Sequence, residues 1–100
     1  PDVPSEILTA AQDSFSEYVR SVTAAQGGWV RDIEQEHNPV KLSYLIASTL
    51  RAEPVVKQHL LEVPSVVDRL VMETALLGQS TTRLKARALE SGPATRFSKN

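Results

Sequence analysis

The stretch that decides the fold is Lys57-Gln58-His59-Leu60-Leu61-Glu62-Val63-Pro64-Ser65-Val66-Val67-Asp68-Arg69-Leu70. It consists of two amphipathic runs that a Pro-Ser pair separates. Proline lacks a backbone N–H and clashes with the preceding helical turn, so Pro64 prevents the first helix from running straight on. Ser65 can cap the restarted helix, and Asp68 favours the positive end of its dipole. The stretch therefore predicts a tight helix-turn-helix joint whose two apolar stripes share one small core.

Helical spacing dominates the chain before this joint, and strand alternation is absent. A first helix is predicted to open with Ser5 as its N-cap and to end at Gly27-Gly28. Its apolar stripe is Leu8, Ala11, Phe15, Tyr18, Val22 and Ala25. The Asn38-Pro39 pair predicts a second helix that reaches about Leu50, because asparagine caps and proline suits the first helical position. Its predicted inner face is Leu42, Leu45, Ile46 and Thr49.

Two shorter segments complete the helical pattern. Pro54 predicts the start of a third helix whose inner residues are Val56, Leu60 and Leu61. The segment 29–36 is a weaker candidate for a short helix, with Trp29, Val30 and Ile33 on one face.

The final helix is predicted to carry Val66, Leu70, Val71, Thr74 and Leu77 on its inner face. Glycine destabilises a helix interior, so Gly78 predicts either a stop or a kink. Helix is expected to resume after residues 79–82 and to stop at Gly92-Pro93. The sequence thus predicts an all-α domain, a small bundle of four to five helices with short connections, of which the last is the longest. It places this helical lobe at residues 1–92 and a flexible C-terminal tail at residues 93–100.

Composition narrows the class of protein. The chain has 100 residues, of which 41% are hydrophobic and 23% charged, as is typical of a soluble globular domain. It has no cysteine, so it forms neither a disulfide framework nor a thiolate metal site. No apolar run approaches the ~18 residues of a membrane span. The segment Pro1-Asp2-Val3-Pro4 lacks the basic region and the apolar stretch that are typical of a secretory signal. We expect a cytoplasmic protein, or one in an organelle matrix if the source is a eukaryote.

The charge is unevenly distributed. Residues 1–78 carry six Lys/Arg and eleven Asp/Glu, whereas residues 79–100 carry five Lys/Arg and one Glu. A basic tail is compatible with nucleic-acid binding, but cations also suit the C-terminal end of a helix. Five cations over this length are few for a nucleic-acid site, so the sequence favours a solvated helix end and argues against a nucleic-acid partner.

The motifs of common catalytic and cofactor sites are missing. Four glycines in all leave no phosphate-binding loop and no dinucleotide fingerprint. His37 and His59 lie far apart in the sequence and do not make a metal site. No serine sits in a nucleophile elbow, and no acid–base pair stands out from the charged helix surfaces. We predict no catalytic, cofactor-binding or metal-binding residue, and no enzyme activity in this chain.

A family resemblance rests on the order of several short motifs. They are Leu45-Ile46-Ala47 with Leu50, Lys57-Gln58 with Leu60-Leu61-Glu62, and Val66 with Arg69-Leu70. In this order they resemble the helical half of the substrate-binding domain of Lon-type ATP-dependent proteases. The segment from Ile7 to Val19 resembles the preceding helix, so the likeness covers about three quarters of the chain.

The resemblance implies a function and a context. It implies a β-rich, PUA-like lobe before the helical lobe, and ATPase and serine–lysine protease centres in later domains without counterparts here. It implies a non-catalytic module that binds unfolded or tagged protein substrates. The alternative is a structural part of an ATP-dependent serine protease that contacts neighbouring subunits. In full proteases the last helix continues, long and charged. Interruption at Gly78 would suit a free-standing Lon-domain protein at least as well as a protease.

Exposed apolar residues at the helix joints are the candidates for partner binding. Adjacent valines, as in Val55-Val56 and Val66-Val67, cannot both lie at the centre of one apolar stripe, so some apolar surface is left for a partner or for the β-rich lobe. The predicted protein-binding residues are Trp29, Tyr44, Leu61, Val63 and Val67. Trp29 has two interpretations, a plug at the end of the bundle or an anchor for a partner, of which the plug is favoured.

Overall fold

The fold consists of four helices. The structure, a computed structural model, describes residues 2–98, with side chains described for residues 2–90. The helices are α1 (Ser5–Ala25), α2 (Pro39–Thr49), α3 (Pro54–Glu62) and α4 (Val66–Ser98). No strand occurs within the described residues, and the last helix is the longest. The predicted all-α bundle is therefore confirmed.

Local signals set most of the helix boundaries. The side chain of Asn38 accepts a hydrogen bond from the Lys41 N–H at 3.1 Å, and Pro39 is the first residue of α2. Ser65 Oγ accepts from the Asp68 N–H at 3.2 Å, which caps α4 as predicted. Gly27 has a φ of +85°, a left-handed conformation that glycine adopts without strain, so it ends α1. Each of these boundaries was predictable from the residue types.

The predicted cap of α1 is wrong by one residue. The N-cap is Pro4, whose carbonyl accepts from the N–H groups of Ile7 and Leu8, and Ser5 is the first helical residue. No side chain caps this helix. The Ser5 hydroxyl therefore does not perform the role that the sequence rule assigns to it.

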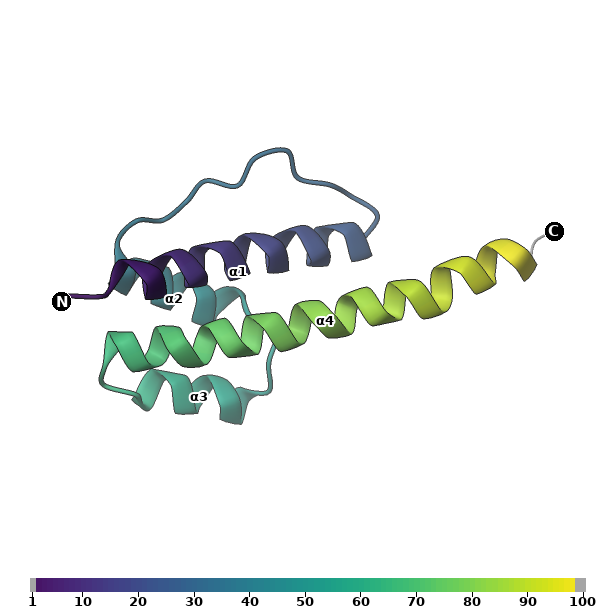
Figure 1. The fold of residues 1–100 in the computed structure, drawn as a ribbon. Coiled ribbons are helices and arrows are strands. Elements are labelled where there is room, and N and C mark those ends of the chain that lie inside the picture. The colour runs from purple at the N-terminus through teal and green to yellow at the C-terminus, as the bar shows by residue number, and fades with distance from the viewer. Residues whose placement is uncertain (1, 99–100) are drawn as a thin grey trace.

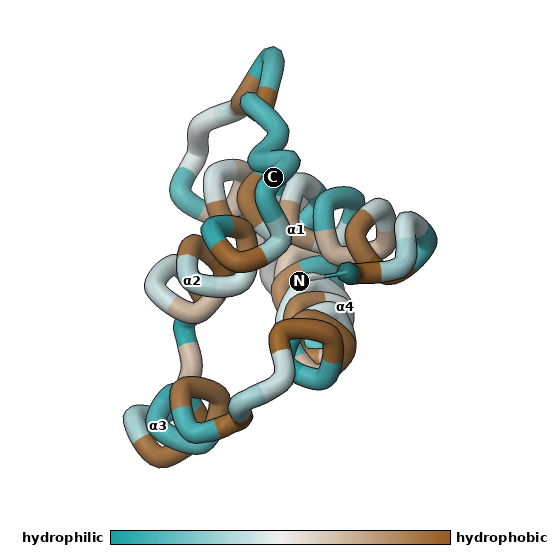
Figure 2. Tube along the Cα trace, turned by 90° about the vertical axis from the view of Figure 1, so that its left-hand side faces the viewer, coloured by the Kyte–Doolittle hydropathy of each residue, from teal (hydrophilic) through white to brown (hydrophobic). Residues whose placement is uncertain are grey.

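The hydrophobic core lies where α1, α2 and α4 meet, and α1 packs along α4 over the most extensive contact (Figure 1). In Figure 2, α2 and α3 lie one above the other on one side of the molecule, and α4 runs past both. The buried apolar residues that form the core cluster are Ala11, Phe15, Tyr18, Leu42, Ile46, Leu50, Leu60, Leu70 and Leu77.

The buried face of α2 is rotated relative to the prediction. Leu42, Ser43, Ile46 and Ala47 are buried, whereas Leu45 and Thr49 are exposed. The line 42–46–50 faces α1 and α4, and a residue one step before it points about 100° away. Leu61 on α3 and Val71 on α4 were also predicted to face inward, and both are half exposed. Leu45 and Leu61 therefore lie at the surface, where they can contact a partner.

The segment 29–36 is not a helix, contrary to the weaker prediction. Residues 26–38 form a loop that arches over α1 on the side away from α3 (Figures 1 and 2). Polar groups of the loop bond to α1: Gln12 Nε2 donates to the Glu36 carbonyl, and Gln35 Nε2 donates to Ser16 Oγ, both at 2.9 Å. Trp29 is 75% exposed, so its interpretation as a plug is wrong.

Helix α4 is continuous where the sequence predicts breaks. It passes through Gly78 and through Gly92-Pro93 to Ser98. A glycine costs about 1 kcal/mol in a helix interior, and the burial of the apolar side chain of Leu77 next to Gly78 offsets this cost. The C-terminal end of α4 extends beyond the other helices (Figure 1). The division into a lobe at 1–92 and a tail at 93–100 stays a prediction.

No helix within residues 2–98 has a stretch long and apolar enough to cross a lipid bilayer.

Candidate functional site

An open apolar groove lies between α2 and α3. It has a volume of about 540 Å³, and the residues that line it are Tyr44, Leu45, Ala47, Ser48, Lys57 and Leu61. The side chains of Tyr44, Leu45 and Leu61 are 53%, 41% and 52% exposed. Three large apolar side chains therefore share one surface depression, and a single cation, Lys57, stands among them.

The groove follows from how α3 packs. This helix has nine residues, and Leu60 is its one fully buried side chain. Leu60 inserts into the core, and the neighbouring Leu61 is directed toward α2 instead. Pro54 begins α3 and Pro64 follows its end, so the helix cannot extend to cover more of α2. The short helix thus leaves the apolar residues of α2 facing water.

Arg69 on α4 connects α2 to the end of α3, the two helices that form the groove. The side chain is only 6% exposed. Its Nε donates to Ser43 Oγ on α2 at 2.7 Å, and its Nη1 donates to the carbonyl of Val63, just after α3, at 3.1 Å. Its guanidinium also lies over the Tyr44 ring, 5.1 Å from the centroid, within the range of a cation–π contact. One side chain of α4 therefore orients Tyr44 and fixes the position of α3 relative to α2.

Glu73 completes a buried polar cluster with Arg69 and Ser43. Its side chain is fully buried, and Ser43 Oγ donates to Glu73 Oε1 at 2.9 Å. Within the described part of the chain, Glu73 Oε2 is buried without a hydrogen-bond partner. Burial raises the pKa of Glu73 to about 7, and the hydrogen bond from Ser43 and the charge of Arg69 oppose this rise. The carboxyl group therefore titrates near neutral pH, directly behind the groove.

The structure separates the five predicted binding residues into three locations. Tyr44 and Leu61 lie together in the groove. Val63 and Val67 are half-buried at the joint between α3 and α4. Trp29 lies on the loop 26–38, which the two views place on the other side of α1 and α2 from α3 (Figures 1 and 2). The predicted residues therefore do not form one surface.

The buried cluster was missed by the sequence analysis, although a signal for it exists. The positions 66, 70, 73 and 77 follow one another at steps of four and three, so Glu73 lies on the apolar stripe of α4. Arg69 precedes Glu73 by four residues, which places the two side chains on neighbouring turns of one face. A charged pair on an apolar stripe indicates that both charged groups are buried. Buried charged groups need hydrogen-bond partners, and Ser43 is one such partner here.

The two histidines lie apart from each other. His37 Nδ1 is 3.4 Å from Gln12 Nε2 beside α1, and His59 is exposed on α3. Within the described residues, no three His, Cys, Asp or Glu side chains gather into a group that could hold a metal ion.

A comparison with known protein families identifies the family of this chain. The family model of the ATP-dependent protease La (LON) substrate-binding domain matches residues 2–79. The chain belongs to this family. The resemblance that the sequence motifs indicate is thereby confirmed, and the chain is a substrate-binding module of the Lon type. Searches of curated proteins and of solved structures gave no match for it.

The match covers most of the packed part of the Lon-type domain. Residues 2–79 contain α1, α2, α3 and the first part of α4, and therefore both the groove and the buried cluster. The rest of α4 lies outside the matched segment. Residues up to Ala88 still line pockets with α1, and only the C-terminal end of α4 extends beyond the other helices (Figure 1).

Proposed function

We propose that this Lon-type domain binds unfolded or tagged protein substrates through the groove between α2 and α3. The observation that carries the proposal is the gathering of Tyr44, Leu45 and Leu61, all exposed, along one groove. Contiguous exposed apolar surface is typical of binding sites and is rare on surfaces that meet only water. The family match supports a protein substrate as the occupant.

An extended segment of unfolded polypeptide suits the chemistry of the groove. Its apolar side chains, which a folded protein would bury, gain from contact with Tyr44 and Leu61. Lys57 stands at the groove and can bond the carbonyl or carboxylate groups of such a segment. Arg69 restricts the movement of Tyr44, so little rotamer freedom remains to be lost on binding. The groove is thus partly preorganised.

Substitutions within and outside the groove test this proposal. The measurement is the dissociation constant of a fluorescently labelled, permanently unfolded polypeptide, obtained by anisotropy. Burying one large apolar side chain completely is worth about 1.5–3 kcal/mol. Leu61 is 52% exposed, so binding can bury about half of it, and Leu61→Ser is expected to weaken binding about three- to tenfold. Tyr44→Ser is expected to act in the same direction. The matched control is Val71→Ser, because Val71 is 52% exposed, like Leu61, but does not line the groove.

Two results would contradict the proposal. One is equal binding by the parent chain and by the Leu61→Ser and Tyr44→Ser variants. The other is an equal loss in the Val71→Ser control, which would show that general surface hydrophobicity is responsible. Circular dichroism of each variant establishes that its helices are intact.

A role in subunit assembly is the second candidate function. It is favoured by the C-terminal end of α4, which extends past the other helices (Figure 1), and by Leu89, which is 74% exposed. Light scattering over a range of protein concentrations measures self-association directly. A mass that rises with concentration in the parent chain and not in Leu89→Ser would support assembly through α4, and a constant monomer mass would count against it.

A further inference from the structure

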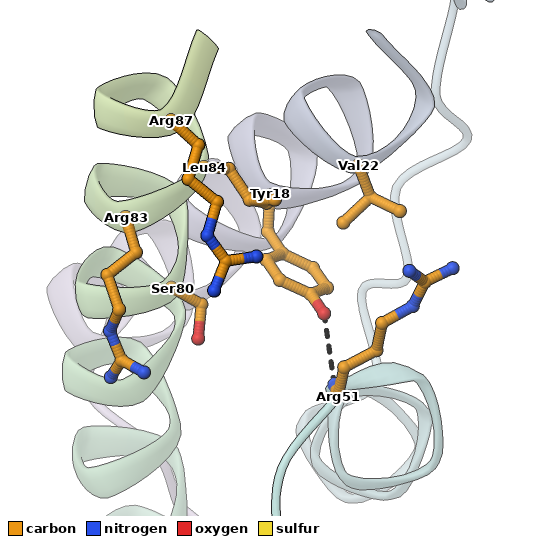
Figure 3. Close-up of a pocket in the computed structure, with 7 residues that line it drawn as sticks. All are labelled: Tyr18, Val22, Arg51, Ser80, Arg83, Leu84 and Arg87. Carbon is orange, nitrogen blue, oxygen red and sulfur yellow. Dashed lines mark hydrogen bonds between the residues drawn. The ribbon is translucent and has the colours of Figure 1, made fainter. Parts of the chain in front are cut away.

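A second pocket lies on a different part of the molecule, where α1, the end of α2 and α4 approach one another. It has a volume of about 160 Å³, and the residues that line it are Tyr18, Val22, Arg51, Ser80, Arg83, Leu84 and Arg87 (Figure 3). None of these residues lines the groove between α2 and α3. The volume is about five times the ~30 Å³ that one water molecule occupies in the liquid, which is room for one small polar group.

The pocket is strongly cationic. Three of its seven lining residues are arginines, and no carboxylate is among the described residues that line it. Arg83 and Arg87 are four residues apart on α4 and so project from the same face, and Arg51 approaches from the connection after α2 (Figure 3). In Figure 3 the Arg87 guanidinium lies beside Tyr18, whereas those of Arg83 and Arg51 point to either side of it. Positive charges around one pocket repel one another, and a bound anion reduces that repulsion. The charge pattern therefore favours an anionic ligand.

Neutral hydrogen-bond donors stand beside the arginines. Tyr18 is only 2% exposed, and its phenol oxygen accepts a hydrogen bond from the backbone N–H of Arg51 at 2.9 Å (Figure 3). Because this bond fixes the oxygen as an acceptor toward Arg51, the phenol proton is directed elsewhere. Ser80 supplies a second hydroxyl from α4. Figure 3 shows the Arg87 side chain extending toward Tyr18. The pocket thus combines a buried, oriented hydroxyl with guanidinium groups.

We propose that this arginine pocket binds the phosphate group of a phosphate monoester. Guanidinium groups bind phosphate oxygens through paired, charge-assisted hydrogen bonds. A dianionic group balances more of the arginine charge than a single carboxylate does, which is why phosphate is preferred. The group can belong to free phosphate or to a phosphorylated serine side chain, and the two sources share the chemistry that the pocket recognises. The proposal is independent of the groove and of what binds there.

The test is a titration of the ¹⁵N-labelled full chain at constant ionic strength. The probes are inorganic phosphate, a short phosphoserine peptide, and the same peptide with glutamate in place of phosphoserine. Saturable shifts of the amide signals of Ser80, Arg83 and Arg87 are expected with phosphate or with the phosphoserine peptide. The tighter of these two probes identifies the source of the phosphate group. Because the second pKa of a phosphate monoester is about 6, binding is expected to strengthen between pH 5.5 and pH 7.5.

Variants locate the binding. Arg87→Gln is expected to weaken phosphate binding at least tenfold, and Tyr18→Phe about threefold, because it keeps the ring but removes the donor. Arg31→Gln is the matched control, since Arg31 is an exposed arginine on the loop 26–38 and the charge change is the same. It is expected to change the affinity less than twofold.

The proposal is overturned by any of three results. The first is the absence of saturable shifts at the pocket with every probe. The second is binding of the glutamate peptide as tight as that of the phosphoserine peptide, which would make the site a general anion site. The third is an equal loss of affinity in Arg31→Gln and Arg87→Gln, which would indicate attraction by net charge alone. Arg83→Gln, an exposed change on α4, replaces Arg87→Gln if the latter alters the amide spectrum of the free chain.

Discussion

At the scale of single residues, the buried cluster of Arg69, Ser43 and Glu73 is the feature with the most consequences. Its hydrogen bonds run in one direction, since Arg69 donates to Ser43 and Ser43 donates to Glu73. A buried, incompletely bonded carboxylate is costly, and protonation reduces that cost. The stability of the domain is therefore coupled to pH through Glu73.

The sign of this coupling is set by the pKa of Glu73, which is about 7 in the folded chain against an ordinary value of 4.5. Between these values the folded chain holds a proton that the unfolded chain releases. The stabilisation is thus fully present below pH 4.5 and is lost as the pH rises through about 7. We expect the free energy of unfolding, measured with urea, to fall on the order of 3 kcal/mol at most between pH 5 and pH 8.

The variant Glu73→Gln removes the titrating group and keeps the shape of the side chain. Its free energy of unfolding should change much less between pH 5 and pH 8, and it should exceed that of the parent chain at pH 8. The matched control is Glu53→Gln, because Glu53 is exposed and should leave the pH dependence unchanged. A parent chain that is as stable at pH 8 as at pH 5 would refute the role assigned to Glu73.

At the scale of helices, short-range signals were sufficient to predict most boundaries and insufficient to predict two features. The caps at Asn38 and Ser65, the prolines at 39, 54 and 64, and the Gly27-Gly28 pair act through local geometry, so the sequence reveals them. The loop at 29–36 and the continuity of α4 at Gly78 depend on packing and on hydrogen bonds to α1 and α4. Tertiary contacts of this kind override local propensity.

The candidate site was predictable in part for the same reason. Apolar residues in excess of one stripe indicated surface exposure, and this reasoning led to Tyr44 and Leu61. It did not lead to Leu45, because the rotation of α2 about its axis depends on how it packs against α1 and α4. It also could not separate Trp29 from the groove, since the path of the loop 26–38 is not encoded in a local motif.

Asn38 and Ser5 both look like helix caps in the sequence, but their substitution by alanine is expected to have different effects on stability. Asn38→Ala should lower the free energy of unfolding by about 1 kcal/mol, because it removes a cap hydrogen bond that is present in the structure. Ser5→Ala is the control, because Ser5 is exposed and its side chain caps nothing, and its effect should stay within about 0.5 kcal/mol. Urea unfolding of the two variants distinguishes them. Equal losses would contradict the helix start at Ser5.

The glycines of the chain allow a similar comparison. A methyl group added at Gly78 meets no atom within 4 Å, and this residue lies inside α4. Gly78→Ala should therefore raise the free energy of unfolding by about 0.5–1 kcal/mol. Gly27→Ala should lower it by about 1–2 kcal/mol, since Gly27 has a φ of +85° and alanine is strained there. A loss of stability in Gly78→Ala would argue that α4 is broken at this residue.

At the scale of the whole molecule, the domain has a packed body and a long extension. The described residues span 56 × 30 × 18 Å, and α4 alone, with 33 residues, accounts for the long axis. The family match covers the groove and the buried cluster, which Arg69 links by contacting both Tyr44 and Ser43. The arginine pocket lies farther along α4, where the body ends. The two candidate sites therefore lie on different elements: the groove on α2 and α3, and the arginine pocket on α1, the end of α2 and α4.

The central claim is that the groove between α2 and α3 receives unfolded polypeptide, and amide NMR tests it most directly. The ¹⁵N-labelled chain is titrated with an unfolded protein and, as a control, with the same protein folded. The account predicts saturable shifts of Tyr44, Leu45, Ser48 and Leu61 with the unfolded form alone, and no shift of Trp29. Shifts confined to Trp29 and the loop 26–38, or no shifts with either form, would contradict it.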